Sequence, residues 1–281
     1  MGPDFTHLPE VGSTNDWLLA RAGALPDRHW VIADRQTAGR GRRGRMWNDG
    51  AGNFMGSVLV HGDGAVQQLS FVAALAVVEA LEKITSRLPF TSPLAGEVKR
   101  RAQRGPVEGS GQMLAHAQPL SPLGSAESDL SPKGRGDLFT LKWPNDVLLN
   151  GTKCAGILLE RQGSALVIGI GINLAQHPEG TERPATSLAA AGLPVAQPLA
   201  VLETLATRFA HWRQFWAQDG FAPIHTAWLA RAHGLGQRMI ARLGTEAPEG
   251  VFDGLAADGA LLLRLDDGSV RIVHAGEVFA I

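Results

Sequence analysis

The sequence lacks the features that stabilise secreted proteins and anchor membrane proteins. It contains a single cysteine, Cys154, which excludes a disulfide framework and is typical of a reducing compartment. No apolar run approaches the roughly 18 residues that a membrane-spanning helix needs. The N-terminal stretch MGPDFTHLPEVGSTND lacks the basic region and apolar core of a signal peptide. We therefore expect a cytoplasmic protein with no membrane partner.

Net charge is also nearly absent. The formal charge at pH 7 is −1 for 281 residues, so no long-range field attracts the protein to nucleic acid, and any anion binding has to be local. Hydrophobic residues make up 44% of the chain, which is ordinary for a globular protein long enough to form one large domain or two smaller ones.

Hydrophobic periodicity predicts both helices and strands. Helices are expected from Ser13 or Thr14, over 68–84, and over 198–232 with a break near 220–223; strands are expected over 29–36, 53–60, 138–143 and 164–174.

The best-defined local prediction is a β-hairpin. The apolar runs DVLLN and KCAGILLE meet at Asn150–Gly151, a dipeptide that readily adopts the positive φ of a primed turn. With the strand over 164–174, this hairpin gives three adjacent antiparallel strands. Strands of this kind combined with helices indicate an α+β fold.

Residues 88–137 differ in composition from the rest. Pro, Gly and Ser supply 19 of these 50 residues, and Phe90 is the only aromatic residue. Such a segment buries too little apolar surface to offset the entropy of ordering it. We expect a disordered insertion within the main domain.

The pattern changes again after about Gly234. Short β-like runs alternate with turns, and Asp-Gly occurs at 253–254, 258–259 and 267–268, the last two as hairpin turns. We expect a main domain over 1–233 and a small C-terminal β-barrel over 234–281.

Positive charge is concentrated in QTAGRGRRGRMW, residues 36–47, here called the arginine segment. Its glycines let the backbone approach a ligand, and its four arginines are bidentate donors for phosphate or carboxylate. A P-loop is rejected because the Gly-Lys-Ser/Thr ending is missing. An RNA-binding segment is usually longer and repeated, and an exposed basic turn is the plainest alternative. We expect the segment to be mobile until a ligand neutralises it.

Four motifs in order resemble the catalytic domain of the biotin–protein ligases. They are GSTND, the arginine segment, KWPNDVLLNGTKCAGILLE and GIGINL. The resemblance implies an α+β, class II synthetase-like domain with a mixed or antiparallel sheet, followed by a small SH3-like C-terminal domain. It also implies that biotin and MgATP form biotinyl-5′-AMP, and that a lysine of an acceptor protein then takes the biotin. Because STND begins at residue 13, we expect the form without an N-terminal DNA-binding domain.

The same resemblance assigns site residues. It implies catalytic roles for Lys142 and Arg42. It places biotin at Ser13, Thr14, Asn15, Gln36, Gly39, Arg40, Gly41, Arg42, Lys142 and Gly171, and the nucleotide at Arg40, Arg42, Arg45, Trp47, Lys142 and Asn173. Cations in these positions suit a reaction that brings anions together. We expect no metal site made of protein side chains alone; Mg²⁺ would enter with ATP.

Simpler interpretations of several residues stay open. Ser13 and Thr14 fit a helix N-cap, and Lys142 fits a surface lysine at a strand end. Gly171 fits a bulge or close strand packing. Asp146 fits a turn, with Mg²⁺ binding as a weaker alternative. Cys154 fits a buried, inert thiol.

The resemblance also implies a partner, the biotin carboxyl carrier protein of acetyl-CoA carboxylase or of a similar carboxylase. The oligomer is expected to be a monomer or a homodimer. Two other functions remain as alternatives: a lipoate–protein ligase of related fold, and a non-catalytic RNA-binding module that uses the arginine segment.

Overall fold

The computed structural model describes residues 2–47, 50–62, 65, 67–87, 138–180 and 184–281. The insertion predicted over 88–137 lies outside the described residues, so that prediction stays open.

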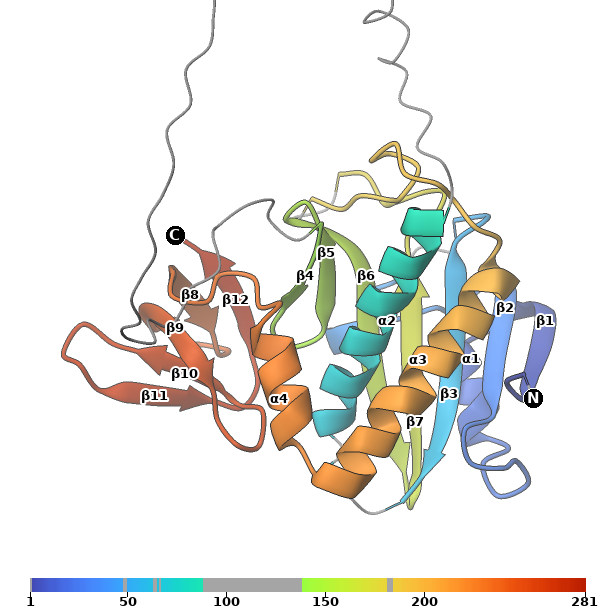
Figure 1. The fold of residues 1–281 in the computed structure, drawn as a ribbon, viewed down its shortest axis with the longest axis horizontal. Coiled ribbons are helices and arrows are strands. Elements are labelled where there is room, and N and C mark those ends of the chain that lie inside the picture. The colour runs from blue at the N-terminus through green and yellow to red at the C-terminus, as the bar shows by residue number, and fades with distance from the viewer. Residues whose placement is uncertain (1, 48–49, 63–64, 66, 88–137, 181–183) are drawn as a thin grey trace, which may run out of the picture. The chain divides into compact units, whose positions relative to one another are not determined.

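A seven-stranded mixed sheet forms the centre of the main domain (Figure 1). Its strand order is β1-β2-β3-β7-β6-β5-β4; β1 is parallel to β2 and every other neighbouring pair is antiparallel. The strands are β1 (Phe5–Val11), β2 (Trp30–Gln36), β3 (Phe54–His61), β4 (Phe139–Lys142), β5 (Asp146–Leu149), β6 (Thr152–Gln162) and β7 (Ala165–Ile172). The predicted α+β fold with a mixed sheet is confirmed.

The hairpin between β5 and β6 is also confirmed. Asn150 has φ 49° and Gly151 has φ 78°, which is the pair of positive values that a primed turn requires.

Helices cover both faces of the sheet. The long helices α2 (Gln68–Arg87) and α3 (Pro198–Asp219) lie side by side over one face, and the short α4 (Ala222–Leu229) follows α3 after the predicted break (Figure 1). The first helix, α1 (Thr14–Leu19), packs with Leu18 on Val31, Leu59 and Val167, which belong to a separate apolar cluster on the other face.

The alternation of side chains along β7 decides what each face carries. Leu166, Ile168, Ile170 and Ile172 join the large core under α2 and α3, because successive strand residues point to opposite faces. On the α1 face the sequence runs Ala165, Val167, Gly169, Gly171. The second half of this face therefore has no side chains, and the sheet surface is open there.

The C-terminal residues form a second, five-stranded antiparallel sheet of order β11-β10-β9-β8-β12. Its strands are β8 (Arg238–Arg242), β9 (Glu249–Leu255), β10 (Leu261–Arg264), β11 (Val270–Val273) and β12 (Glu277–Ala280). The two predicted Asp-Gly hairpin turns are confirmed, with φ 90° at Gly259 and φ 83° at Gly268.

The edge strand β1 was not predicted from the sequence. All seven of its residues are half-buried or exposed, so it lacks the apolar signal of an inner strand. Side chains help to fix it on β2: His29 contacts Thr6 Oγ1 at 2.9 Å and Asp4 Oδ2 at 3.0 Å.

No helix in the described part of the chain is long and apolar enough to cross a membrane.

One turn of the C-terminal sheet is packed against the main domain. A Cβ at Gly259 would lie 2.8 Å from the Phe71 ring of α2, and the Gly259 carbonyl accepts a hydrogen bond of 3.0 Å from Trp143 Nε1. The equivalent Gly268 has no atom within 4 Å of an added Cβ.

This contrast predicts different costs for two alanine substitutions. Gly268→Ala should lower the free energy of unfolding by about 1 kcal/mol, because only the positive φ is strained. Gly259→Ala should cost about 1–3 kcal/mol more, because the methyl group also overpacks the Phe71 contact. Urea unfolding measures both, and equal losses would show that the Gly259 turn does not bear on the main domain.

Candidate active site

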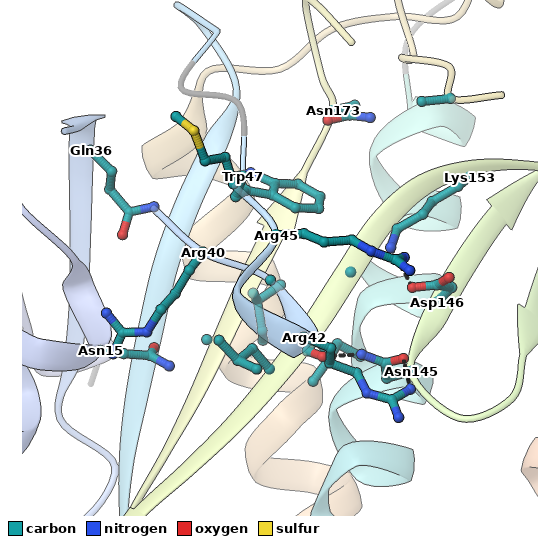
Figure 2. A pocket seen from close by; sticks show the side chains of 18 of the residues that line it. Asn15, Gln36, Arg40, Arg42, Arg45, Trp47, Asn145, Asp146, Lys153 and Asn173 are labelled. Carbon is teal, nitrogen blue, oxygen red and sulfur yellow. Dashed lines mark hydrogen bonds and ion pairs between the residues drawn. The ribbon is translucent and has the colours of Figure 1, made fainter. Parts of the chain in front are cut away.

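A cavity of about 560 Å³ opens on the α1 face of the large sheet. Its walls come from the start of α1, the end of β2, the arginine segment, the neighbouring strands β5 to β7, and β12 of the C-terminal sheet. Figure 2 shows Asn15, Gln36 and Arg40 toward one side and Arg42, Asn145, Asp146 and Lys153 toward the other, with Trp47 between. The lining residues that carry polar or aromatic groups are Ser13, Thr14, Asn15, Gln36, Arg40, Arg42, Arg45, Trp47, Trp143, Asn145, Asp146, Lys153, Asn173 and Glu277.

Glycines make room for two side chains of the cavity wall, Trp47 and Asn15. A Cβ at Gly171 would lie 2.3 Å from Cε2 of Trp47, and one at Gly156 on β6 would lie 3.1 Å from Cζ3 of the same ring. A Cβ at Gly169 would lie 2.5 Å from Asn15 Oδ1. Gly171 is therefore a site of close packing, as the simpler interpretation proposed. The close contact is with the Trp47 indole, which lies directly on the strand backbone.

The side around Asn15 is a largely buried network of neutral groups, bordered by the ion pair of Arg40 and Glu160. Gln36 Oε1 accepts hydrogen bonds from Thr14 N at 2.8 Å and Thr14 Oγ1 at 3.0 Å. Ser57 Oγ lies 2.6 Å from Asn15 Oδ1 and 2.7 Å from Thr14 Oγ1. Ser13, Thr14 and Asn15 are each at most 4% exposed. Such fixed donors and acceptors can recognise a neutral polar group.

The N-cap interpretation of Ser13 is confirmed. Its hydroxyl accepts from the Asp16 amide at 3.5 Å, at the first turn of α1. Capping occupies the acceptor side of the hydroxyl, and the O–H remains as a donor on a residue that lines the cavity.

The arginine segment is a narrow hairpin. Trp47 N donates to Gly39 O at 3.0 Å and Gly41 N to Arg45 O at 2.7 Å, and the tip has positive φ at Arg43 (58°) and Gly44 (71°). Gly39 is packed behind the cavity wall, where an added Cβ would lie 3.2 Å from Gln36 Nε2.

Carboxylates from other elements neutralise these arginines. Arg40 contacts Asp16 Oδ1 at 2.5 Å and Glu160 Oε1 at 3.0 Å. Arg45 contacts Glu277 Oε1 of the C-terminal sheet at 3.0 Å. The compensation that we expected from a ligand is thus partly supplied by the chain itself. Mobility of the segment stays a prediction.

The tip of the segment also joins two elements through Arg42. This arginine donates to Asn145 Oδ1 at 3.1 Å and to the carbonyl of Gly276 at 3.3 Å. The first contact lies just before β5 and the second just before β12, so one side chain links the arginine segment to both sheets.

A cation that the sequence interpretation missed lines the other side of the cavity. Lys153 Nζ lies 2.5 Å from Oδ1 of the buried Asp146. The register between β5 and β6 shifts at this point, with Val147 opposite Ala155 and Leu148 opposite Lys153. Cys154 is the extra residue, and a bulge of this kind re-aims its neighbours. Lys153 thereby reaches the same face as Asp146.

Lys142 occupies a different place. It lies at the end of the edge strand β4, and its Nζ is 5.4 Å from the centre of the Phe279 ring. It borders a small cavity of about 40 Å³ with His233, whose pKa is lowered by burial and by the charge of Lys142. Among the described residues, the lining of the large cavity includes Lys153 and not Lys142. The catalytic role predicted for Lys142 stays a prediction that its position does not support.

Three more of the predicted nucleotide-binding residues lie in the cavity wall. Arg45, Trp47 and Asn173 line the cavity, and Asn173 Nδ2 donates to the Thr186 carbonyl at 3.0 Å. The buried Nε1 of Trp47 has no hydrogen-bond partner within the described ranges. Cys154 is buried, and burial raises the pKa of its thiol to about 12, which fits an inert side chain.

We searched the described part of the chain for side chains that could bind a metal ion without a ligand's help. No group of three His, Cys, Asp or Glu residues there is arranged to hold an ion.

Three family models match this chain and define its class. The model of the biotin/lipoate A/B protein ligase family matches residues 9–176, a second model of that family matches 135–230, and the model of the biotin protein ligase C-terminal domain matches 234–280. The chain belongs to the biotin/lipoate A/B protein ligase family.

The individual proteins to which the chain is similar include biotin ligases. The chain is 39% identical to a biotin–[acetyl-CoA-carboxylase] ligase of Paracoccus denitrificans, over 97% of this chain and 98% of that protein. It is 28% identical to the bifunctional ligase/repressor BirA of Escherichia coli, over 96% of this chain and 72% of that protein. Its fold is similar to the biotin protein ligase of Aquifex aeolicus in complex with biotin and ATP, with a TM-score of 0.73, 25% identity, and 99% of each chain covered.

The contact between Arg40 and Asp16 should shift the pKa of the Asp16 carboxyl, which can be measured. The hydrogen bond from Arg40 lowers the pKa of Asp16 from 3.8. Because the folded-state value lies below the unfolded one, the pair stabilises the fold above that unfolded pKa. This contribution declines as the pH falls through the folded-state value, which lies below 3.8.

Arg40→Ala should therefore return the pKa of Asp16 toward 3.8. NMR titration of the Asp16 carboxyl measures this. Arg35→Ala is the matched control, because Arg35 pairs with Glu10 at 2.9 Å and should leave Asp16 unchanged. An identical Asp16 titration in the Arg40→Ala and unsubstituted proteins would contradict the pairing.

Proposed function

We propose that this protein is an ATP-dependent biotin–protein ligase, which activates biotin as biotinyl-5′-AMP and transfers it to a lysine of a carrier protein. The observation that carries the proposal is one cavity with neutral donors and acceptors beside the carboxylate-paired Arg40 on one side, and Arg42, Arg45 and Lys153 toward the other. Identity of 39% to a biotin–[acetyl-CoA-carboxylase] ligase over 97% of the chain supports it.

The neutral side suits the ureido ring of biotin. That group has one carbonyl acceptor and two N–H donors, and Ser13, Asn15 and Gln36 present groups of both kinds in fixed orientations. Trp47, which the resemblance assigned to the nucleotide, supplies an apolar wall between the two sides of the cavity. Ser13, Thr14, Asn15 and Gln36 are therefore our proposed biotin contacts, and Trp47 stays a proposed nucleotide contact.

The cationic side suits the first reaction. A carboxylate oxygen of biotin attacks the α-phosphorus of ATP, a C–O–P linkage forms, and pyrophosphate leaves. Both reactants are anions, so cations must offset their repulsion and stabilise the charge that develops on the phosphorus oxygens. Lys153 lines this side, and Asp146 fixes its ammonium group in place. Arg42 and Arg45 line the same region from the arginine segment.

Mg²⁺ would enter with the nucleotide. Such ions are usually held by one or two carboxylates and by the phosphates of the substrate. Asp146 is a buried carboxylate in the cavity wall and is the side chain that we assign to this contact. Because Asp146 is paired with Lys153, the phosphates of the nucleotide would have to supply further ligands for the ion.

In the second reaction the neutral amine of an acceptor lysine attacks the acyl carbon of biotinyl-5′-AMP. The C–N bond forms, AMP leaves with the electron pair, and the proton passes to solvent. The proposed acceptor is the biotin carboxyl carrier protein of acetyl-CoA carboxylase or of a similar carboxylase, as the name of the Paracoccus relative indicates. The cytoplasmic location and the monomeric or dimeric state stay predictions from the sequence.

The cavity disfavours the two alternatives. The dithiolane ring of lipoate has no N–H or carbonyl group to pair with Ser13, Asn15 and Gln36, so the polar groups on this side of the cavity would give it no hydrogen bonds. Against the RNA-binding alternative, Arg40 and Arg45 are already paired with carboxylates at the cavity, which reduces the charge available to nucleic-acid phosphates.

ATP–pyrophosphate exchange tests the function directly. The purified protein should exchange labelled pyrophosphate into ATP when biotin is added, and should show little exchange with lipoate. Mass spectrometry of a carrier domain should then show one biotin on one lysine. A folded protein that forms no biotinyl-5′-AMP would overturn the proposal, and lipoate-dependent exchange would favour the related ligase.

The two lysines give a second prediction. Lys153→Ala should slow single-turnover formation of biotinyl-5′-AMP by about 10²–10³-fold, because a charge beside the reacting carboxylate and phosphate is lost. Lys142→Ala should change this rate much less, since Lys142 borders the separate small cavity. The opposite ranking would restore the role first predicted for Lys142.

A further inference from the structure

Glu160 is a carboxylate next to the cavity that the proposed reaction does not use. It lies on β6, on the same face as Gly156, and its side chain is 24% exposed. It belongs to the supporting layer of the wall, since among the described residues the lining contains its two partners, Asn15 and Arg40, and not Glu160 itself. The sequence interpretation missed it, because it ends the apolar run AGILLE and carries no spacing signal.

Both oxygens of Glu160 are engaged. Oε2 accepts a hydrogen bond of 2.6 Å from Asn15 Nδ2 and one of 3.1 Å from Arg40 Nη2. Oε1 accepts a hydrogen bond of 3.0 Å from Arg40 Nε. Arg40 therefore holds the carboxylate, and the carboxylate in turn holds the amide of Asn15.

This arrangement fixes which way the Asn15 amide faces. Its oxygen accepts from Ser57 Oγ at 2.6 Å and its nitrogen donates to Glu160. An ionised carboxylate accepts hydrogen bonds and donates none. A flipped Asn15 would set its oxygen against the Glu160 oxygen, two acceptors at hydrogen-bond distance, which is unfavourable in a buried site.

We propose that Glu160 is a positioning residue for biotin: it holds the Asn15 amide in one orientation, so that an N–H of Asn15 is always available to the ureido group. This inference rests on the proposed function and deepens it. Glu160 contacts no substrate: of its two partners, Arg40 holds the carboxylate in place and Asn15 carries its effect to biotin. Its effect falls on the binding of biotin, while the binding of ATP, on the other side of the cavity, is independent of it.

Glu160→Gln is the informative variant, because glutamine is nearly isosteric and can itself flip. The substituted amide can donate to the Asn15 oxygen as well as accept from the Asn15 nitrogen, so both orientations of Asn15 become satisfied. In the molecules with a flipped Asn15, the ureido group of biotin then meets the amide oxygen in place of the N–H. The Kd for biotin, measured by calorimetry without ATP, should rise by about 10-fold, equivalent to about 1.4 kcal/mol. The KM for ATP should stay within about 2-fold.

Asp16→Asn is the matched comparison. Asp16 accepts from Nη1 and Nη2 of the Arg40 guanidinium, at 2.7 Å and 2.5 Å, whereas Glu160 accepts from Nε and Nη2. Within the described chain, the Asp16 carboxylate contacts the side chain of Arg40 but not that of Asn15. If Glu160 acted by neutralising Arg40, the two variants would weaken biotin binding equally. We expect Asp16→Asn to change the Kd for biotin by less than about 2-fold.

A double-mutant cycle completes the test. In an Asn15→Ala background, Glu160→Gln should have almost no further effect on the Kd for biotin, because the group that it orients is gone. Thermal melting of each variant checks folding. Glu160→Asp, which keeps the charge for Arg40 but shortens the reach to Asn15, replaces Glu160→Gln if the latter does not fold.

The outcomes separate this inference from the proposed function. If the unsubstituted protein neither binds biotin nor forms biotinyl-5′-AMP, the proposed function fails. If it does both and Glu160→Gln binds biotin as tightly as the parent, only the positioning role is overturned. A Glu160→Gln effect that persists at full size in the Asn15→Ala background also overturns it.

Discussion

The site depends on a stretch of sheet that has no side chains on one face. Gly169 and Gly171 of β7 and Gly156 of β6 face the α1 side, while the isoleucines between and beside them fill the core under α2 and α3. Trp47 and Asn15 lie directly on this bare backbone, since a single methyl group at Gly171 or Gly169 would occupy the same space. The period of two along one strand thus builds the core and the cavity together.

Charge compensation is the second constraint on the site. The arginine segment carries four cations on a backbone with little packing of its own. Carboxylates from three distant elements hold it: Asp16 from α1, Glu160 from β6 and Glu277 from β12. The C-terminal sheet therefore contributes to the cavity wall, and the family match over 234–280 corresponds to a part of the chain that touches the site.

Much of the fold follows from local signals in the sequence. Asn150–Gly151 marked a primed hairpin, and the apolar run over 164–174 marked the strand that is β7. The edge strand β1 carried no such signal, because contacts such as His29 with Asp4 and Thr6 hold it to its neighbour. Long-range contacts of this kind leave no period in the chain.

The site was predictable in its neutral half and less so in its charged half. Ser13, Thr14, Asn15 and Gln36 were expected at one ligand, and the structure brings them together. Lys153 was missed because a bulge at Cys154 turns it to the cavity, and simple alternation cannot locate a bulge.

The most direct test is a crystal structure of the protein with biotin and a non-hydrolysable ATP analogue. The account predicts the ureido ring beside Asn15 and the carboxylate near Lys153; the reverse orientation, or biotin bound outside this cavity, would contradict it.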